Sequence, residues 1–122
     1  MPIDTNVSTA TILAGNSAST FVPVANIHQL SFWIPSVWDA ANVSVQLSRL
    51  SAPTSPAVEA EWFTVADAFG EVSFPAKANH TYSLSTTILL PNAKWLRLIS
   101  GTAAARVNQV ADRAIEITTR RY

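Results

Sequence analysis

The sequence predicts an all-β fold, a single-domain β-sandwich of jelly-roll type with about eight strands. Two observations lead to this prediction. Apolar residues recur at every second position in several short runs, and turn-forming residues separate these runs. Two sheets of such strands bury their apolar faces against each other. The 122 residues suit one domain, which we place over residues 1–122.

The clearest alternation is Val-Ser-Val-Gln-Leu-Ser at residues 43–48, which predicts a strand with one buried and one solvated face. The run Trp-Leu-Arg-Leu-Ile at residues 95–99 predicts a central strand covered on both sides. Alternation or β-branched composition predicts the remaining strands at residues 7–13, 20–25, 29–34, 81–85 and 114–117.

Two segments are ambiguous. Residues 57–69 have apolar side chains at helical spacing, but the Trp-Phe-Thr-Val run and the Asp-Ala-Phe-Gly turn that follows favour a strand. Residues 102–112 are rich in alanine and compatible with a short helix. We interpret them as an ordered loop between the last two strands.

Composition indicates a protein that works by binding and assembly. Charged residues make up 13% of the chain, against the usual value of about 25%, and the formal net charge is zero. A chain with so few charges is expected to hide part of its surface against other subunits. The alternative is a monomer coated with Ser, Thr and Asn.

The charge distribution gives no indication of nucleic-acid or membrane binding. The first half of the chain is net acidic and the second half net basic, without the clustered basic face that nucleic acid requires. No apolar run approaches the length of a membrane helix, and no secretory signal is visible. We therefore expect synthesis as a soluble chain in the cytoplasm.

No residue pattern indicates catalysis, a cofactor or a metal. The absence of cysteine excludes disulfides, thiolate catalysis and thiolate zinc sites. His28 and His80 lack metal-ligand spacing, and the acidic residues are scattered, although Glu59 and Glu61 could share one side of a strand. A calcium site at Asp67 near Gly70, or at Asp112 with Asn108, is an alternative. The favoured interpretation is that these are ordinary turn residues.

Candidate interaction residues are aromatic or lie at the C-terminus. Trp38, in an irregular stretch, and then Trp33 are the tryptophans most suited to anchor an interface, whereas Trp62 and Trp95 are expected in the core. Arg120, Arg121 and Tyr122 form a basic, aromatic end that suits docking on an acidic neighbour. A frayed terminus is an equal alternative.

The closing segment, Trp-Leu-Arg-Leu-Ile-Ser-Gly-Thr followed by Val-Asn-Gln-Val-Ala-Asp-Arg and Ile-Glu-Ile, resembles that of small β-sandwich structural proteins of tailed bacteriophages. The Trp-Phe-Thr-Val-x-Asp-Ala-Phe-Gly segment is also similar to theirs. The resemblance implies that Asn108, Gln109, Asp112 and Arg113 hold the last loop together by hydrogen bonds and an ion pair. Arg106 departs from the family pattern and suggests a contact particular to this chain.

From this resemblance we expect a non-enzymatic virion structural protein, made in the bacterial host cytoplasm. Its role would be that of a capsid cement or decoration protein that clamps the major capsid protein or other virion proteins. A dimer or a trimer is expected in this role, because repeated attachment at symmetry axes raises avidity. The alternative is a receptor- or carbohydrate-binding β-sandwich module on a tail or fibre.

Overall fold

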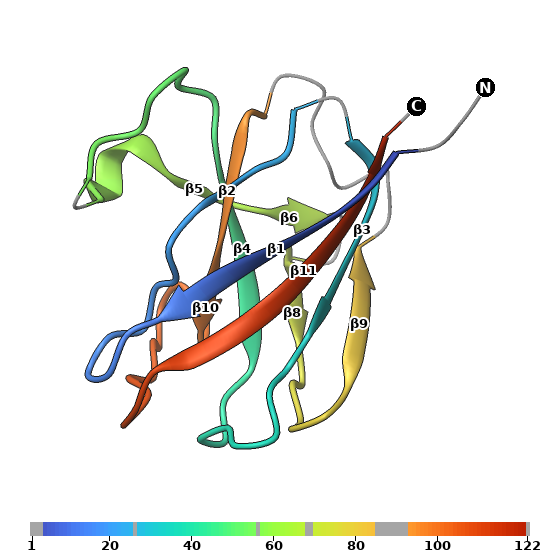
Figure 1. The fold of residues 1–122 in the computed structure, drawn as a ribbon. Helices are drawn as coiled ribbons and strands as arrows, with labels where there is room; N and C mark the ends of the chain where they lie inside the picture. Colours follow the sequence, from blue (N-terminus) through green and yellow to red (C-terminus); the bar gives the residue numbers. More distant parts are fainter. Residues whose placement is uncertain (1–3, 26, 56, 68–69, 85–92, 122) are drawn as a thin grey trace.

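The computed structural model describes residues 4–25, 27–55, 57–67, 70–84 and 93–121, and within these it is all-β, with two antiparallel sheets packed as a sandwich (Figure 1). The first sheet has the strand order β1 (Asp4–Ile12), β11 (Arg113–Arg121), β3 (Ile27–Trp33), β9 (Thr81–Leu84). The second has β2 (Val22–Pro23), β10 (Trp95–Ser100) and β4 (Val43–Ser48), with β5 (Phe63–Thr64) and β8 (Ser73–Phe74) both paired to β4. A small hairpin joins β6 (Ala66–Asp67) to β7 (Gly70–Glu71).

The strand pairing is nested, which is the connectivity of a jelly roll. β1 pairs with β11, β2 with β10, β3 with β9, and β4 with β5 and β8, as if one long hairpin had been wrapped into a sandwich. The predicted all-β sandwich of jelly-roll type is therefore confirmed. The described residues contain eleven strands where about eight were predicted, because several partners along the second sheet are two-residue fragments.

The core lies between the sheets and follows the predicted alternation. Leu30 and Phe32 of β3 and Ile115 and Ile117 of β11 face it from the first sheet, with Ile34 just beyond β3. From the second sheet come the apolar residues of β4 and β10: Val43, Val45, Leu47, Leu96 and Leu98. Burial of each such aliphatic side chain contributes about 1.5–3 kcal/mol to the free energy of folding.

The prediction of a solvated face on residues 43–48 is wrong. Ser44, Gln46 and Ser48 are as buried as the apolar residues that alternate with them. The described residues between β4 and β5, 49–55 and 57–62, fold over the outside of the second sheet and include a 3-10 turn, Glu59–Glu61. The strand's polar face therefore meets buried polar partners of its own chain, where the sequence suggested water. Residues 95–99 are covered on both sides, as predicted.

Two other segments differ in detail from the prediction. Residues 20–25 contribute only the short β2, and the chain before it runs beside β10 through the bridge between Ala18 and Ile99. Residues 57–69 form the 3-10 turn and then β5 and β6, so the helix alternative is not realised in the described part; Ala68 and Phe69 lie outside it. Residues 102–112 form a loop without α-helix, as predicted, pinned by a bridge between Gly101 and Arg106.

Gly101 directly follows β10, and both its positive φ and the close approach of the next loop require a glycine there. Comparing Gly101→Ala with Gly15→Ala separates these two effects. The φ of Gly101 is +96°, and a Cβ there would lie 2.4 Å from the carbonyl oxygen of Ala105 and 2.8 Å from the nitrogen of Val107. Gly15 also has positive φ (+82°), but a Cβ there meets nothing within 4 Å. We expect Gly101→Ala to cost at least about 2 kcal/mol more than Gly15→Ala, which has only the backbone strain of about 1–2 kcal/mol.

Urea unfolding of both variants measures this difference. Equal losses of stability would contradict the tight approach of the loop to Gly101.

Candidate functional site

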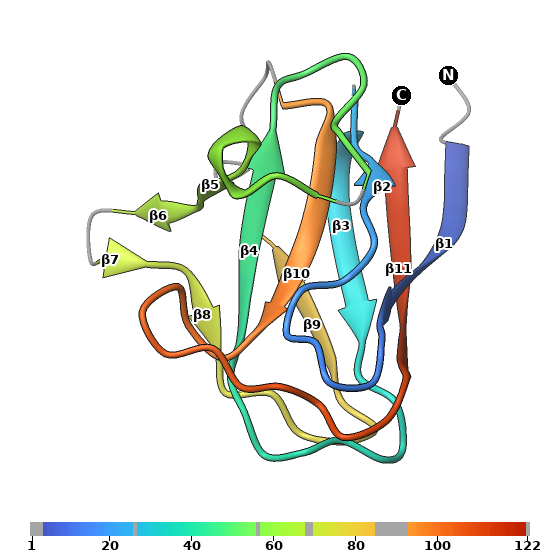
Figure 2. The same ribbon diagram turned by 90° about the vertical axis from the view of Figure 1, so that its left-hand side faces the viewer.

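Three connecting segments gather at one end of the sandwich, which we call the loop end: residues 13–21, 34–42 and 101–112 (Figure 2). They meet because β1 and β3 run in the same direction and β11 lies antiparallel between them. The loop that precedes β11 therefore ends where the other two strands finish. This end is the first candidate site.

Gln109 is the hub of the loop end and is fully buried. Its side-chain Oε1 accepts hydrogen bonds from the Asp39 backbone N–H (2.9 Å) and from Arg113 Nε (3.1 Å). Its Nε2 donates to the Asp39 carbonyl oxygen (3.1 Å) and to Ser100 Oγ (2.9 Å). All four hydrogen-bonding positions of the amide are used, so the loops are held in one arrangement.

Charged side chains complete this network. Asp39 accepts from the Val110 N–H (2.7 Å) and forms an ion pair with Arg113 (3.3 Å), whose side chain is buried. The backbone N–H of Ala14 donates to Asp112 Oδ1 (2.8 Å), which ties the first loop to the last. Because these carboxylates accept hydrogen bonds from groups of their own chain, they help to hold the three loops together.

Aliphatic side chains project from this rigid end. Val110 is 77% exposed, Val37 is 62% exposed and Leu13 is 50% exposed, and each lies in one of the three tied loops. Loops normally present polar side chains to water, and apolar residues held on a stiff surface suit contact with another macromolecule. The loop end therefore has the composition and rigidity of a docking surface.

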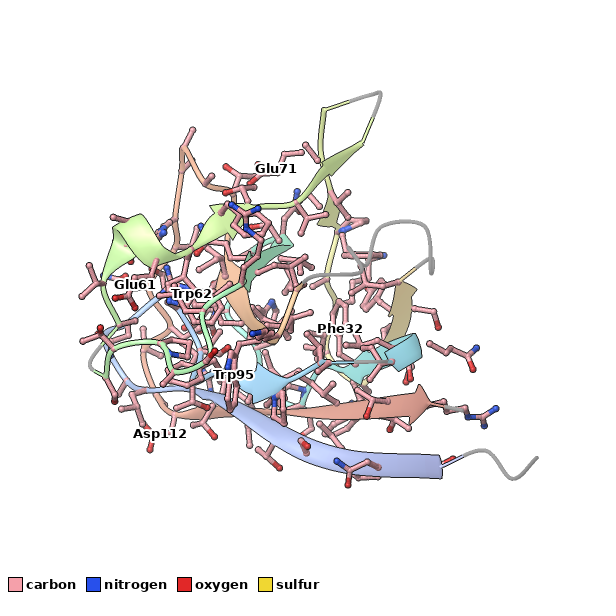
Figure 3. All side chains as sticks on the ribbon, turned by 90° about the horizontal axis from the view of Figure 1, so that it is seen from above. Phe32, Glu61, Trp62, Glu71, Trp95 and Asp112 are labelled. Atoms are coloured by element: carbon pink, nitrogen blue, oxygen red, sulfur yellow. The ribbon has the colours of Figure 1, made fainter. Side chains whose placement is uncertain are left out.

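The second candidate site lies on the outer face of the second sheet, around Arg97. This arginine projects from the middle of β10, and its side chain is only 2% exposed. Its Nε donates to Gln46 Oε1 (2.8 Å), its Nη2 donates to Glu59 Oε2 (2.8 Å), and its guanidinium stacks on the Trp62 ring 4.9 Å from the centroid. Trp62 and Trp95 both contact Phe21, away from the inter-sheet residue Phe32 (Figure 3).

Glu59 connects the buried arginine to an outer one. Arg106 donates to both Glu59 oxygens, at 3.2 and 2.8 Å, so one carboxylate bridges two guanidinium groups. The hydrogen bonds from Arg106, assisted by the charge of Arg97, hold the pKa of Glu59 below its usual value of 4.5. Burial lowers the pKa of Arg97, and the charge of Glu59 opposes this effect.

A cleft of about 580 Å³ opens beside this ion-pair cluster. Its walls come from residues 16–21 and from the segment before the 3-10 turn, with Arg97, Arg106 and Glu59 at one side. Five of the lining side chains carry hydroxyl groups: Thr11, Ser17, Ser19, Thr20 and Ser55. Such a lining suits a neutral, hydroxyl-rich ligand.

The predicted aromatic anchors differ in exposure. Trp33 is exposed on the outer face of the first sheet, whereas Trp38 is half-buried against the core and donates from Nε1 to the Ala41 carbonyl oxygen (3.2 Å). Trp62 is buried, as predicted, but it covers the outside of the second sheet and does not join the inter-sheet core. Trp95 is half-buried beside it.

The predicted polar candidates separate into three groups. Gln109, Asp112 and Arg113 lie in the loop-end network, while Asn108 is exposed beside them. Arg106 binds Glu59 of its own chain. Arg120 is exposed near the end of β11, and the side chains of Arg121 and Tyr122 lie outside the described residues, as does that of His28.

Sequence reasoning missed Asp39 and Arg97, and it considered Glu59 only as a possible partner of Glu61 on one side of a strand. A signal for Arg97 was present, because a charge inside an apolar central strand must find partners when it is buried. The partners themselves are remote: Glu59 is 38 residues from Arg97, and Asp39 is 74 residues from Arg113. No local pattern connects such positions.

Comparisons with known proteins place this chain in no family. No protein-family model, no curated protein and no solved structure matches the chain significantly. Among the described residues, no three His, Asp or Glu side chains lie close enough together to hold a metal ion. No helix in that part of the chain is long and apolar enough to span a bilayer.

The ion-pair cluster predicts a particular acid sensitivity. Because the folded-state pKa of Glu59 lies below its ordinary value, its contribution to stability is complete above about pH 4.5 and is lost as the pH falls through the folded-state pKa. We expect Glu59→Gln to cost about 1–2 kcal/mol at pH 7, a figure reduced for solvent because the side chain is 60% exposed. The difference from the native chain should shrink at acidic pH.

Chemical denaturation across the acid range tests this expectation. Glu116→Gln, which removes a carboxylate from the exposed side of β11, is the matched control. A cost of Glu59→Gln that stays constant with pH would contradict the assignment.

Proposed function

We propose that this chain is a non-enzymatic structural protein of a tailed-bacteriophage particle, a cement or decoration protein that docks on the assembled shell through its loop end. The observation that carries the proposal is the set of exposed aliphatic residues, Leu13, Val37 and Val110, on loops fixed by the Gln109 network. A preorganised apolar surface loses little conformational entropy when it binds.

Two further observations support the same role. The resemblance at residues 62–70 and 95–117 is to virion structural proteins, and the jelly roll is an architecture of viral capsid proteins, although it also serves lectins and enzymes. The polar clusters of the described residues bind their own chain, which suits a scaffold. A protein that binds the assembled shell more tightly than its separated subunits stabilises the shell by mass action.

Co-sedimentation with assembled shells of the major capsid protein of the same virus tests the proposal. The paired substitution Val37→Asp with Val110→Asp should weaken shell binding at least about tenfold, because it places charges in an apolar contact. The matched control is Leu50→Asp with Val58→Asp, two exposed aliphatic residues in the segment between β4 and β5. The control should bind as the native chain does.

Absence of binding to shells, or equal loss in both paired variants, would contradict docking through the loop end. Thermal unfolding of each variant alone shows whether the fold is intact.

A second candidate function is a carbohydrate-binding module of a tail or fibre, and the hydroxyl-lined cleft beside Arg97 favours it. Hydroxyl groups, a carboxylate and guanidinium groups are the partners that bind sugar hydroxyls. Phe21 adds an aromatic ring to the wall.

A glycan array tests this second function. If the cleft binds sugar, Ala57→Trp, which fills it with a large ring, should abolish binding, while Ala114→Trp on the exposed side of β11 should not. A native chain that binds no glycan, or an Ala57→Trp variant that binds normally, would exclude the cleft as a sugar site.

A further inference from the structure

The long strand β1 forms one edge of the first sheet (Figure 2). It pairs with β11 on one side, and on the other side it contacts the described residues only near its end. There Thr20 donates its N–H to the Thr11 carbonyl oxygen (2.9 Å), and the Thr11 N–H donates to Thr20 Oγ1 (3.0 Å). Thr11 therefore directs its backbone groups away from β11.

This orientation fixes which backbone groups of β1 are free. Directions alternate along a strand, so Thr5, Val7 and Thr9 also direct their N–H and C=O away from β11. Among the described residues, nothing pairs with this stretch of the edge. Three residues thus offer about six backbone hydrogen-bonding groups in a row.

The stretch lacks the features by which proteins protect an edge strand. Natural edges carry lysine, other charges, proline or a bulge that prevents pairing with another chain. Residues 5–12 contain no charged residue and no proline, and the β1–β11 register runs without a bulge from Asp4 to Ile12. The residues along the edge are β-branched, and Val7 is 57% exposed.

We propose that β1 pairs with β1 of a second copy of this chain, antiparallel about a twofold axis at Val7. The product is a dimer in which the two first sheets join into one continuous sheet. The proposal does not depend on the shell partner, because it concerns a different face of the molecule from the loop end.

The free groups select a register as well as a partner. With Val7 opposite Val7, Thr5 of each copy lies opposite Thr9 of the other, and every free residue of the edge is used once. A shift of two residues toward the end of β1 would place Thr5 opposite Thr11, whose backbone groups are already bonded to Thr20. The register centred on Val7 is therefore the one that satisfies the whole free stretch.

The charges flanking this register are compatible with it. Arg120 lies beside Thr5 on β11, and Glu116 lies beside Thr9. In the dimer each row across the four strands would run Arg120, Thr5, then Thr9 and Glu116 of the second copy. Opposite charges therefore end each row, and like charges do not face each other.

Self-pairing of an edge also determines the number of copies. A contact in which the same strand is used by both partners is isologous and closes after two copies. Of the dimer and the trimer expected for a cement protein, this geometry selects the dimer. A strand from a different protein would need its own unprotected edge, whereas a second copy supplies an identical one.

The test is the mass of the full chain in solution over a range of concentration up to about millimolar, by sedimentation equilibrium. The native chain should approach twice its monomer mass. Val7→Lys places like charges face to face at the axis and should raise the dimer dissociation constant at least about tenfold. Val58→Lys, a charge-matched change at an exposed aliphatic residue outside β1, should leave it unchanged.

A cross-link checks the register in the same samples. The chain has no cysteine, so Val7→Cys introduces a single thiol. Residues directly opposite in a hydrogen-bonded antiparallel pair have Cα atoms about 5.5 Å apart, within the range that a disulfide spans. Oxidation should link Val7→Cys chains into dimers much faster than Val110→Cys chains, whose thiol lies on the exposed loop end.

A monomer at every concentration, a trimer, a Val7→Lys variant that dimerises normally, or equal cross-linking of the two cysteine variants would each overturn the proposal. Shell binding by the Val7→Lys variant is measured separately. Failure of dimerisation is thereby distinguished from failure of the docking function.

Discussion

The placement of β11 between β1 and β3 is the constraint on which the rest of this structure depends. It brings the two ends of the described chain into one sheet, with Asp4 opposite Arg121. Because β11 is antiparallel to both neighbours, the loop before it meets the loops after β1 and β3 at one end. The same placement leaves β1 as the edge of the sheet. Both proposed contact surfaces, the loop end and the β1 edge, follow from this one pairing.

Two buried polar networks fix the connecting segments that strand pairing does not hold in place. At the loop end, Gln109 connects three segments through a fully used amide. On the outer face of the second sheet, Arg97 connects β10, β4 and the 3-10 turn through Gln46 and Glu59. A buried charge is costly unless it is paired, so each network requires that its remote partners be in place before it stabilises the fold. These networks make the loop end and the outer face of the second sheet stiff, which suits binding without rearrangement.

The low charge of the chain has a specific distribution in space. The formal ion pairs of the described residues, Glu59 with Arg97 and Arg106 and Asp39 with Arg113, lie within the two networks. Several of the few charges are thus committed to internal contacts. Beside the remaining exposed charges, the described surface offers hydroxyl groups, scattered aliphatic residues and a free strand edge. Such a surface associates through backbone pairing and apolar contact more readily than through charge.

The sequence by itself determined the fold class, the central strand at residues 95–99, the strands at 29–34 and 114–117, and the loop at 102–112. Their signals are local, since alternation and turn residues act over a few positions. Tertiary structure alone decided that the polar side of residues 43–48 is buried, because its cover is the segment 49–62 and its partner is Arg97. It also decided that Trp62 lies outside the inter-sheet core, and that Asp39 and Glu59 are the carboxylates that pair with the buried arginines. These outcomes depend on contacts between residues far apart in the chain, which strand order brings together and which no local pattern encodes.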